Sequence, residues 1–146
     1  MSQDYTGEDL SDEDHSNEDF RGCDFSDADL SDAVLQGATL AEADLSSVDM
    51  SGADLAGADV TGADLSSADL SDADLSNVDF SGASIDSADL SGSSLDGATL
   101  SGVDIQRSDL SGATFDGAEL DGVDIQSSDY DREAVEEQAA TVDLEG

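Results

Sequence analysis

Large apolar side chains recur at every fifth position along most of the chain. The series begins at Phe20, Phe25 and Leu30 and continues without a break to Tyr130. From Cys23 onward, a small residue, usually alanine, lies two positions before each large one, and an aspartate usually separates the two. The two remaining positions of each repeat are mostly polar, and the second is often glycine. The chain is therefore built from repeats five residues long.

A period of five fits neither an α-helix nor a straight β-strand. An α-helix turns about 100° per residue, so five residues would rotate the apolar stripe away from any one face. In a strand, successive side chains point to opposite faces, so every second repeat would point outward. The pattern works if the chain turns a corner in each repeat, because the small and large residues, two apart, then both face inward. Glycine at the second polar position supplies the positive φ that a type II turn needs there.

A second period of twenty residues overlies the first. The segments 102–109 and 122–129 read GVDIQRSD and GVDIQSSD. When the second corner residues are grouped by their position in the twenty-residue period, one group never contains glycine. It consists of Asp27, Ser47, Ser67, Ser87, Arg107 and Ser127. We therefore expect four repeats to form one coil, and coils to stack at the ~4.8 Å spacing of β-strands. The glycine-free corner is expected to use a different turn type.

These repeats resemble the pentapeptide-repeat family, whose consensus is A-(D/N)-L-x-x, over most of the chain. The resemblance implies an all-β fold, a right-handed quadrilateral β-helix with a core of leucine, phenylalanine and alanine. We expect about five and a half coils, stacked like the strands of a parallel sheet. Asparagine, which the consensus allows between the two inward residues, is absent from that position in the repeats. The expected division is an N-terminal tail in 1–18, the β-helix in 19–131, and a capping helix with a tail in 132–146.

The N-terminal segment 1–18 keeps the five-residue period only weakly. The core slot at position 15 holds the single histidine, and the small-residue slots hold Glu8, Glu13 and Glu18. Together with its acidity, this pattern predicts a disordered or loosely held tail. No ligand cluster or nucleophile accompanies His15 in the sequence, so a metal-binding or catalytic role for it is disfavoured.

Beyond Tyr130 the five-residue pattern ends and helical spacing begins. Asp131 is placed to cap a helix, and acidic residues follow in the first turn. Val135, Ala139 and Val142 are spaced to share one face of that helix. The helix is expected to cover the last coil and protect its strand edge. The alternative is a homodimer formed through this end, which the resemblance implies because some members that bind topoisomerases dimerise.

The chain is strongly acidic, with 38 aspartate and glutamate residues, three arginines, no lysine and a formal net charge of −35. Such a charge repels nucleic acid and anionic membranes and favours a protein partner with a basic surface. No membrane-spanning stretch or signal sequence is recognisable, so a cytoplasmic protein is expected. Cys23 falls in a small-residue slot and is expected to pack in the core. No pattern indicates a metal or cofactor, and the serines lack a neighbouring base, so an enzyme is not expected.

When the aspartates are grouped by their position in the twenty-residue period, two adjacent acidic faces are predicted. Their candidate partner-binding residues are Asp24, Asp29, Asp44, Asp49, Asp64, Asp69, Asp89, Asp104, Asp109, Asp124 and Asp129. The face that begins with Asp29 is unbroken, whereas Ser84 interrupts the other once. Uncharged residues such as Val34 and Thr39 dilute the remaining two faces.

Two explanations are open for this acidity. The first is adaptation to the cytoplasm of a halophilic organism, because near-molar salt reduces the Debye length to ~3 Å and weakens the repulsion between carboxylates. The second is mimicry of DNA, which the resemblance implies because some family members bind DNA gyrase and relieve its inhibition by quinolones. The function expected is a non-catalytic interaction or scaffold protein, with gyrase-directed DNA mimicry as the alternative and a purely structural, solute-tolerant rod without a partner as a third class.

Overall fold

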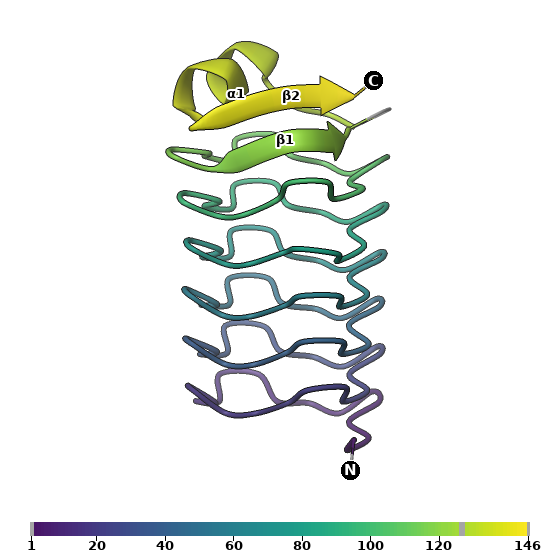
Figure 1. Ribbon diagram of the computed structural model, residues 1–146. Helices are drawn as coiled ribbons and strands as arrows, with labels where there is room; N and C mark the ends of the chain where they lie inside the picture. The colour runs from purple at the N-terminus through teal and green to yellow at the C-terminus, as the bar shows by residue number, and fades with distance from the viewer. Residues whose placement is uncertain (1, 126–127, 146) are drawn as a thin grey trace.

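The computed structural model describes residues 2–125 and 128–145. The chain winds as a stack of similar turns, and its two ends lie at opposite ends of the stack (Figure 1). Three regular elements lie near the C-terminus, in the order β1 (Glu119–Asp124), α1 (Arg132–Gln138) and β2 (Thr141–Glu145). Met1, Ser127 and Gly146, which fall within the expectations above, lie outside the described residues.

Successive turns of the chain are joined by parallel β-bridges between residues twenty apart, as in Asp29 to Asp49 and Asp49 to Asp69. The backbone of each repeat bonds in both directions along the stack. The Leu30 N–H donates to the Asp49 carbonyl over 2.7 Å, and the Asp49 N–H donates to the Ala28 carbonyl over 3.0 Å. The absence of proline suits this arrangement, because proline has no N–H to donate to a neighbouring turn.

Each corner is closed by a hydrogen bond across three residues. The Ala53 N–H donates to the Met50 carbonyl over 3.0 Å, and Gly52 between them has φ +68°. The expected positive φ at the second corner residue is confirmed. The expectation of a different turn at the glycine-free corner is wrong, because Ser67 also has positive φ, at +59°, and the Ala68 N–H donates to the Leu65 carbonyl. Short polar side chains occupy this region at a cost of roughly 1–2 kcal/mol, so the turn survives without glycine.

The corner side chains of one turn pack against the glycines of the next. A Cβ built on Gly52 would lie 2.3 Å from the Asp32 Oδ1 one turn earlier, so the exposed Asp32 side chain would have to move to admit an alanine there. A Cβ on Gly57, at the neighbouring corner, would meet nothing within 4 Å. Both glycines have nearly the same φ, +68° and +69°. The two corners therefore differ in packing and not in backbone conformation.

The core is a continuous column of large and small apolar residues. Side chains such as Leu35, Leu55 and Leu75 are at most 1% exposed, and the alanines between them are almost as well buried. Cys23 is 5% exposed and belongs to this core. Two serines are buried with it, and the Ser108 hydroxyl donates to the Ile85 carbonyl over 2.7 Å, which satisfies its hydrogen bonding without water.

The disordered tail expected for residues 1–18 differs from the structure of residues 2–18. Bridges join Asp4 to Asp24 and Asp9 to Asp29, and the segment forms the first turn of the stack. The Tyr5 ring stacks on Phe25 with centroids 4.6 Å apart, and the His15 N–H donates to the Val34 carbonyl. The backbone bonds that join turns do not need a large apolar side chain in every slot, so pairing continues where the sequence pattern is weak.

The C-terminal elements lie beside the last turn. Asp131 caps α1 by accepting from the Ala134 N–H over 3.1 Å, and Val135 is buried, so a short helix follows Asp131. The helix is shorter than expected, because residues from Thr141 onward form β2, which pairs in parallel with β1. The register changes by one residue between Asp121 and Val123. Val142 therefore lies on a strand, where pairing with β1 overrides the helical spacing of the sequence.

Candidate functional site

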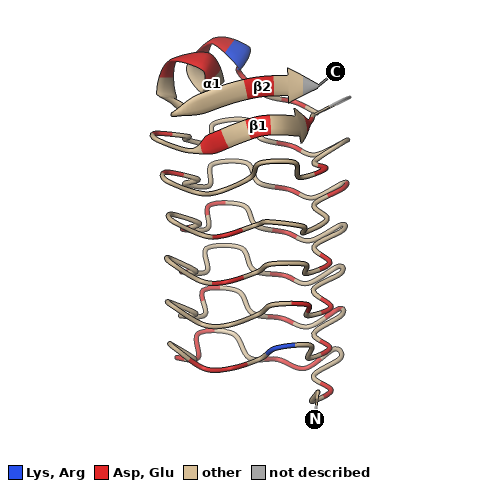
Figure 2. Ribbon diagram, in the orientation of Figure 1, with Lys and Arg blue, Asp and Glu red and all other residues tan. Residues whose placement is uncertain are grey.

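The predicted acidic faces form two columns that run along the stack. The Asp29 column consists of Asp9, Asp29, Asp49, Asp69, Asp89, Asp109 and Asp129, which are joined successively by β-bridges. The Asp24 column consists of Asp4, Asp24, Asp44, Asp64, Ser84, Asp104 and Asp124, joined in the same way. All the predicted site residues lie at the surface, half-buried or exposed. Acidic residues occur in turn after turn of the stack (Figure 2).

Most of these carboxylates also close a local turn. The Asp69 Oδ1 accepts from the Ser71 N–H over 3.0 Å and from the Ser71 hydroxyl over 2.6 Å. The same pair of bonds is made by Asp24, Asp29, Asp44, Asp49, Asp64, Asp89 and Asp109 with the serine two residues on. An aspartate that bonds the backbone two residues ahead mimics a turn and favours the corner that follows. The columns therefore have a structural role as well as a charge.

The three remaining predicted residues, Asp104, Asp124 and Asp129, do not make this pair of bonds with a serine. The Asp104 Oδ1 accepts from the Gln106 N–H over 3.1 Å, and the residue at that corner, glutamine, has no hydroxyl to add a second bond. Asp124 accepts from the Gln106 side-chain amide over 2.8 Å, one turn away. Asp129 pairs through its backbone with Asp109 and has an exposed side chain.

The serine bonds change the acidity of the carboxyls. The Ser26 hydroxyl, and after it the Ser26 N–H, lowers the pKa of Asp24 below its ordinary value. Ser111 acts in the same way on Asp109, whose pKa is also lowered. Both bonds favour the ionised carboxylate, so these groups keep their charge at neutral pH although each lies one turn from another carboxylate.

Sequence reasoning missed the serines, although a signal for them was present. Serine or threonine follows most of the column aspartates at the second position, and the order is reversed at three of the repeats in which serine or threonine replaces the aspartate. Ser84 is followed by Asp86, Ser94 by Asp96, and Thr114 by Asp116. This pairing of an acceptor with a hydroxyl two residues away indicates a local hydrogen bond, which an acidic surface alone does not require.

The other two faces carry fewer carboxylates, as expected, and some of these bind other side chains. On these faces, Asp54 accepts from the Gln36 amide over 2.5 Å. Asp86, at the corner between the Asp24 and Asp29 columns, pairs with Arg107 over 2.6 Å. The Arg107 and Asp86 side chains are 60% and 29% exposed, so solvent and salt screen this ion pair and it adds little stability.

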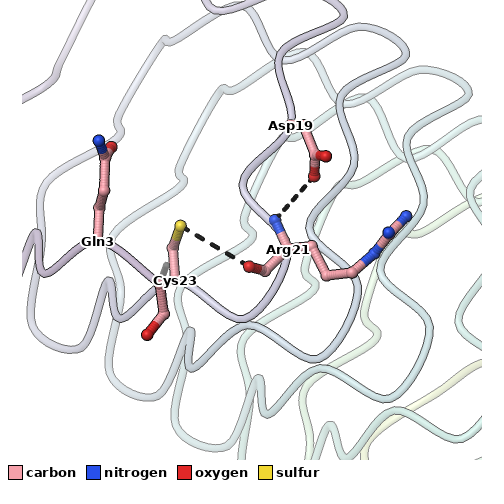
Figure 3. Close-up of a pocket in the computed structure, with 5 residues that line it drawn as sticks. Gln3, Asp19, Arg21 and Cys23 are labelled. Carbon is pink, nitrogen blue, oxygen red and sulfur yellow. Dashed lines mark hydrogen bonds between the residues drawn. The ribbon is translucent and has the colours of Figure 1, made fainter.

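A hollow at the N-terminal end is lined by Ser2, Gln3, Asp19, Arg21 and Cys23 (Figure 3). Its polar groups are largely engaged with one another, since the Arg21 N–H donates to Asp19 and the Cys23 thiol faces the Arg21 carbonyl at 4.0 Å. Within 2–125 and 128–145, no group of three or more histidine, cysteine, aspartate or glutamate side chains is placed to hold a metal ion. The hollow therefore holds no cluster of metal-ligating side chains among the described residues.

The family model for pentapeptide repeats matches the chain in eight copies, over residues 23–62, 53–92, 63–102 and 93–129. The chain belongs to the pentapeptide-repeat family. No curated protein matches it. Among the helices of the described residues, none has the length and apolar character needed to cross a membrane.

Three solved pentapeptide-repeat structures illustrate the similarity. Rfr23 from the cyanobacterium Cyanothece 51142 is 25% identical over 88% of this chain and 91% of that protein, with a TM-score of 0.49. The protein alr5209 from Nostoc PCC 7120 is 42% identical over 62% of this chain and 71% of its own, with a TM-score of 0.41. QnrB1, a plasmid-mediated fluoroquinolone resistance protein, is 21% identical over 92% and 83%, with a TM-score of 0.46. The family assignment rests on the repeat match and not on these superpositions.

Proposed function

We propose that this protein is a non-catalytic interaction rod that binds a protein with a basic surface along its two acidic columns. The rod is a right-handed, four-sided β-helix of about five and a half coils over residues 23–132, to which the N-terminal turn adds one more. The observation that carries the proposal is the unbroken Asp29 column beside the Asp24 column. Two parallel rows of carboxylates on a stiff backbone offer a regular surface for lysine and arginine side chains.

The overall acidity is best explained by life in concentrated salt. The net charge of −35 extends to the N-terminal turn and to α1, far beyond what two binding columns need. Carboxylates one turn apart repel by about 1 kcal/mol even in bulk water. Near-molar salt, as in the cytoplasm of a halophilic organism, suppresses most of that repulsion.

Mimicry of DNA is the second candidate. It is favoured by the regular rows of negative charge along the columns, since the DNA backbone also carries regularly spaced negative charges. At ~4.8 Å per turn, two adjacent columns present about one charge per 2.4 Å of rod, whereas B-DNA presents one per ~1.7 Å. The rod is thus somewhat less dense in charge than DNA along this side. The partner in this case is DNA gyrase or a related topoisomerase, and the effect is a change in sensitivity to quinolones.

The binding role of the columns can be tested by replacing aspartate with asparagine. Asparagine keeps the Oδ1 that accepts from the serine and removes the charge, so the corners are preserved. The test variant changes Asp29, Asp49, Asp69 and Asp89; the control changes Asp54, Asp59, Asp74 and Asp79 on the other two faces. In a pull-down at the salt of the host, a basic partner is expected to be retained by wild type and control and lost by the test variant. Equal retention by both variants would exclude the Asp29 column as the binding surface.

The DNA-mimic candidate has a separate assay. Purified gyrase is assayed for supercoiling with and without the protein and a quinolone, using the same two variants. Mimicry predicts that wild type and the control variant alter supercoiling or quinolone inhibition and that the Asp29-column variant does not. If wild type has no effect on either activity, DNA mimicry of gyrase is eliminated and the interaction rod stands without it.

A homodimer through the C-terminal end belongs with these proposals. Because β2 occupies the edge of β1, such a dimer would join the outer edges of two β2 strands.

A further inference from the structure

The two acidic columns are interrupted together at one level of the stack. Before it, four successive turns carry a carboxylate in both columns. These pairs, which we call the N-terminal block, are Asp4 and Asp9, Asp24 and Asp29, Asp44 and Asp49, and Asp64 and Asp69. In the next turn Ser84 replaces the aspartate of the first column, and only Asp89 of the second column remains. Paired carboxylates resume one turn later with Asp104 and Asp109.

Two corner residues lie between the columns in each turn, and we call this row the seam. Within the N-terminal block the seam consists of Thr6 and Gly7, Ser26 and Asp27, Ser46 and Ser47, and Ser66 and Ser67. Its serine hydroxyls bond the column beside them, as Ser46 does to the Asp44 Oδ1 over 2.6 Å. A basic side chain placed over this part of the seam has carboxylates on both sides and no positive charge between them.

The seam changes where the first column is interrupted. Asp86 lies in the seam beside Ser84, and Arg107 enters the seam one turn later. The Arg107 Nη2 lies 2.6 Å from the Asp86 Oδ2, and the Arg107 side chain is 60% exposed. Of the three arginines in the chain, Arg107 alone lies between the columns, because Arg21 is on the far side of the first column and Arg132 is in α1. Since solvent screens the pair, stability does not account for a cation at this place.

Buried serine hydroxyls hold the backbone on which Arg107 stands. The Ser108 N–H donates over 3.1 Å to the Ser128 hydroxyl, which donates over 2.6 Å to the Ile105 carbonyl. The Ser108 hydroxyl ties the corner of Asp86 in the same way one turn earlier. Both partners of the ion pair therefore project from corners that are fixed to the turn that follows them.

We propose that Arg107 limits the footprint of the basic partner, which binds the N-terminal block and not the turns around Arg107. This inference rests on the proposed function, because it gives a position along the columns to the partner that the columns bind. Near Arg107, a lysine or arginine of the partner finds Asp86 already paired and meets a like charge. Such a repulsive element beside an attractive surface restricts where a partner binds.

The boundary also fixes the register of the complex. Identical columns offer a partner equivalent positions every ~4.8 Å along the rod, so charge attraction alone would let it slide from turn to turn. Ser84 and Arg107 end this equivalence at one level. The partner therefore has one preferred position, on the N-terminal side of the interruption.

The position is tested with a capped hexalysine peptide as the basic probe, at the lowest salt at which the protein is folded. One variant changes Asp44, Asp49, Asp64 and Asp69 to asparagine, and the matched variant changes Asp89, Asp104, Asp109 and Asp129. Both remove four charges from the same columns and keep the Oδ1 atoms, so a difference between them reports position. The first variant is expected to weaken binding about tenfold, and the second about twofold through the loss of net charge.

The role of Arg107 is tested by Arg107→Ser, which introduces the residue usual at this seam position in the other turns. In NMR spectra of the ¹⁵N-labelled wild type, hexalysine should shift the amides of the N-terminal block. In Arg107→Ser it should also shift those of Asp89 and Asp109 and bind about threefold more tightly, since a single exposed charge has a small effect. The control Arg132→Ser makes the same change of charge in α1 and should leave the shifts and the affinity as in wild type.

The possible results separate this proposal from the proposed function. Equal weakening by the two asparagine variants would overturn the boundary and leave the columns as the binding surface. If neither variant weakened binding, the columns would not be the surface, and both proposals would fail. Shifts that already reach Asp109 in wild type, or a pattern and affinity that Arg107→Ser does not change, would show that Arg107 sets no boundary.

Discussion

At the scale of single residues, the corner positions are the most informative part of this protein. The same five-residue corner is made with glycine, serine, aspartate, asparagine and arginine at positive φ. What distinguishes the corners is the side chain one turn away: Asp32 lies over Gly52, and Asp72 lies over Gly92. A residue at a corner is therefore restricted by its own φ and by the corner one turn before it.

This restriction predicts different costs for two otherwise equivalent substitutions. Gly57→Ala should destabilise the protein by about 1–2 kcal/mol, because alanine at positive φ is strained. Gly52→Ala should cost about 1 kcal/mol more, because its Cβ would meet the Asp32 Oδ1. Urea unfolding at fixed salt measures both. In the background of Asp32→Gly, which removes the side chain without placing alanine at positive φ, Gly52→Ala should cost no more than Gly57→Ala; if it does, the contact between turns is not the cause.

At the scale of elements, the sequence predicted the repeats well and the two ends poorly. The inward slots and the positive φ at the corners followed from periods of five and twenty, because each repeat satisfies its packing in the same way as its neighbours. The backbone pairing of residues 2–18 could not be predicted from these periods, because Glu8 and His15 break the apolar pattern while the backbone continues to pair. The strand β2 was also missed, because its pairing with β1 is a tertiary contact that no local pattern records.

The acidic surface was predicted in position but not in full. The columns form where sorting by twenty places them. The bonds from Ser26 to Asp24 and from Ser71 to Asp69 were not predicted, although the hydroxyl two residues after most column aspartates signals them. The period of twenty predicts the charge of these residues, but not that their Oδ1 atoms also stabilise the turns.

The capping helix gives a prediction at this scale. Asp131→Ala removes the bond to the Ala134 N–H and should destabilise the C-terminal cap by about 1 kcal/mol. Hydrogen exchange should then accelerate about fivefold at the Gly117 and Ala140 amides, which bond across the cap. The control is Asp143→Ala, which removes an exposed acid from β2 without a capping role. Equal acceleration of exchange in both variants would mean that the loss of a negative charge, and not the loss of the helix cap, causes the local unfolding of the C-terminal segment.

At the scale of the whole molecule, electrostatic repulsion opposes the packing of the core. With a net charge of −35 and carboxylates about 4.8 Å apart along each column, the folded rod holds more like charge in contact than the unfolded chain does. The serine bonds offset part of this cost locally, and dissolved salt offsets it throughout. Stability should therefore depend on ionic strength more than on any single contact.

The prediction is a strong rise of the unfolding temperature with salt. Between 0.15 and 2 M KCl the Debye length falls from ~8 Å to below ~3 Å, so the midpoint of thermal unfolding, followed by circular dichroism, should rise by ten degrees or more, about the effect of several kcal/mol. The variant with Asp29, Asp49, Asp69 and Asp89 changed to asparagine should be more stable than wild type in low salt and less dependent on KCl. A midpoint that does not change with KCl would argue against salt adaptation as the reason for the acidity.

The pairing of residues twenty apart has a further consequence for how the rod is made. Each turn finds its hydrogen-bond partners in the turn synthesised just before it, so the first turn to leave the ribosome can serve as a template for the next. Growth then proceeds in one direction and needs no contact between distant parts of the chain. The segment with α1 and β2 emerges after the coils and occupies the growing edge, so assembly ends there. A chain that lost this segment would be synthesised normally and would keep an edge still competent to add strands.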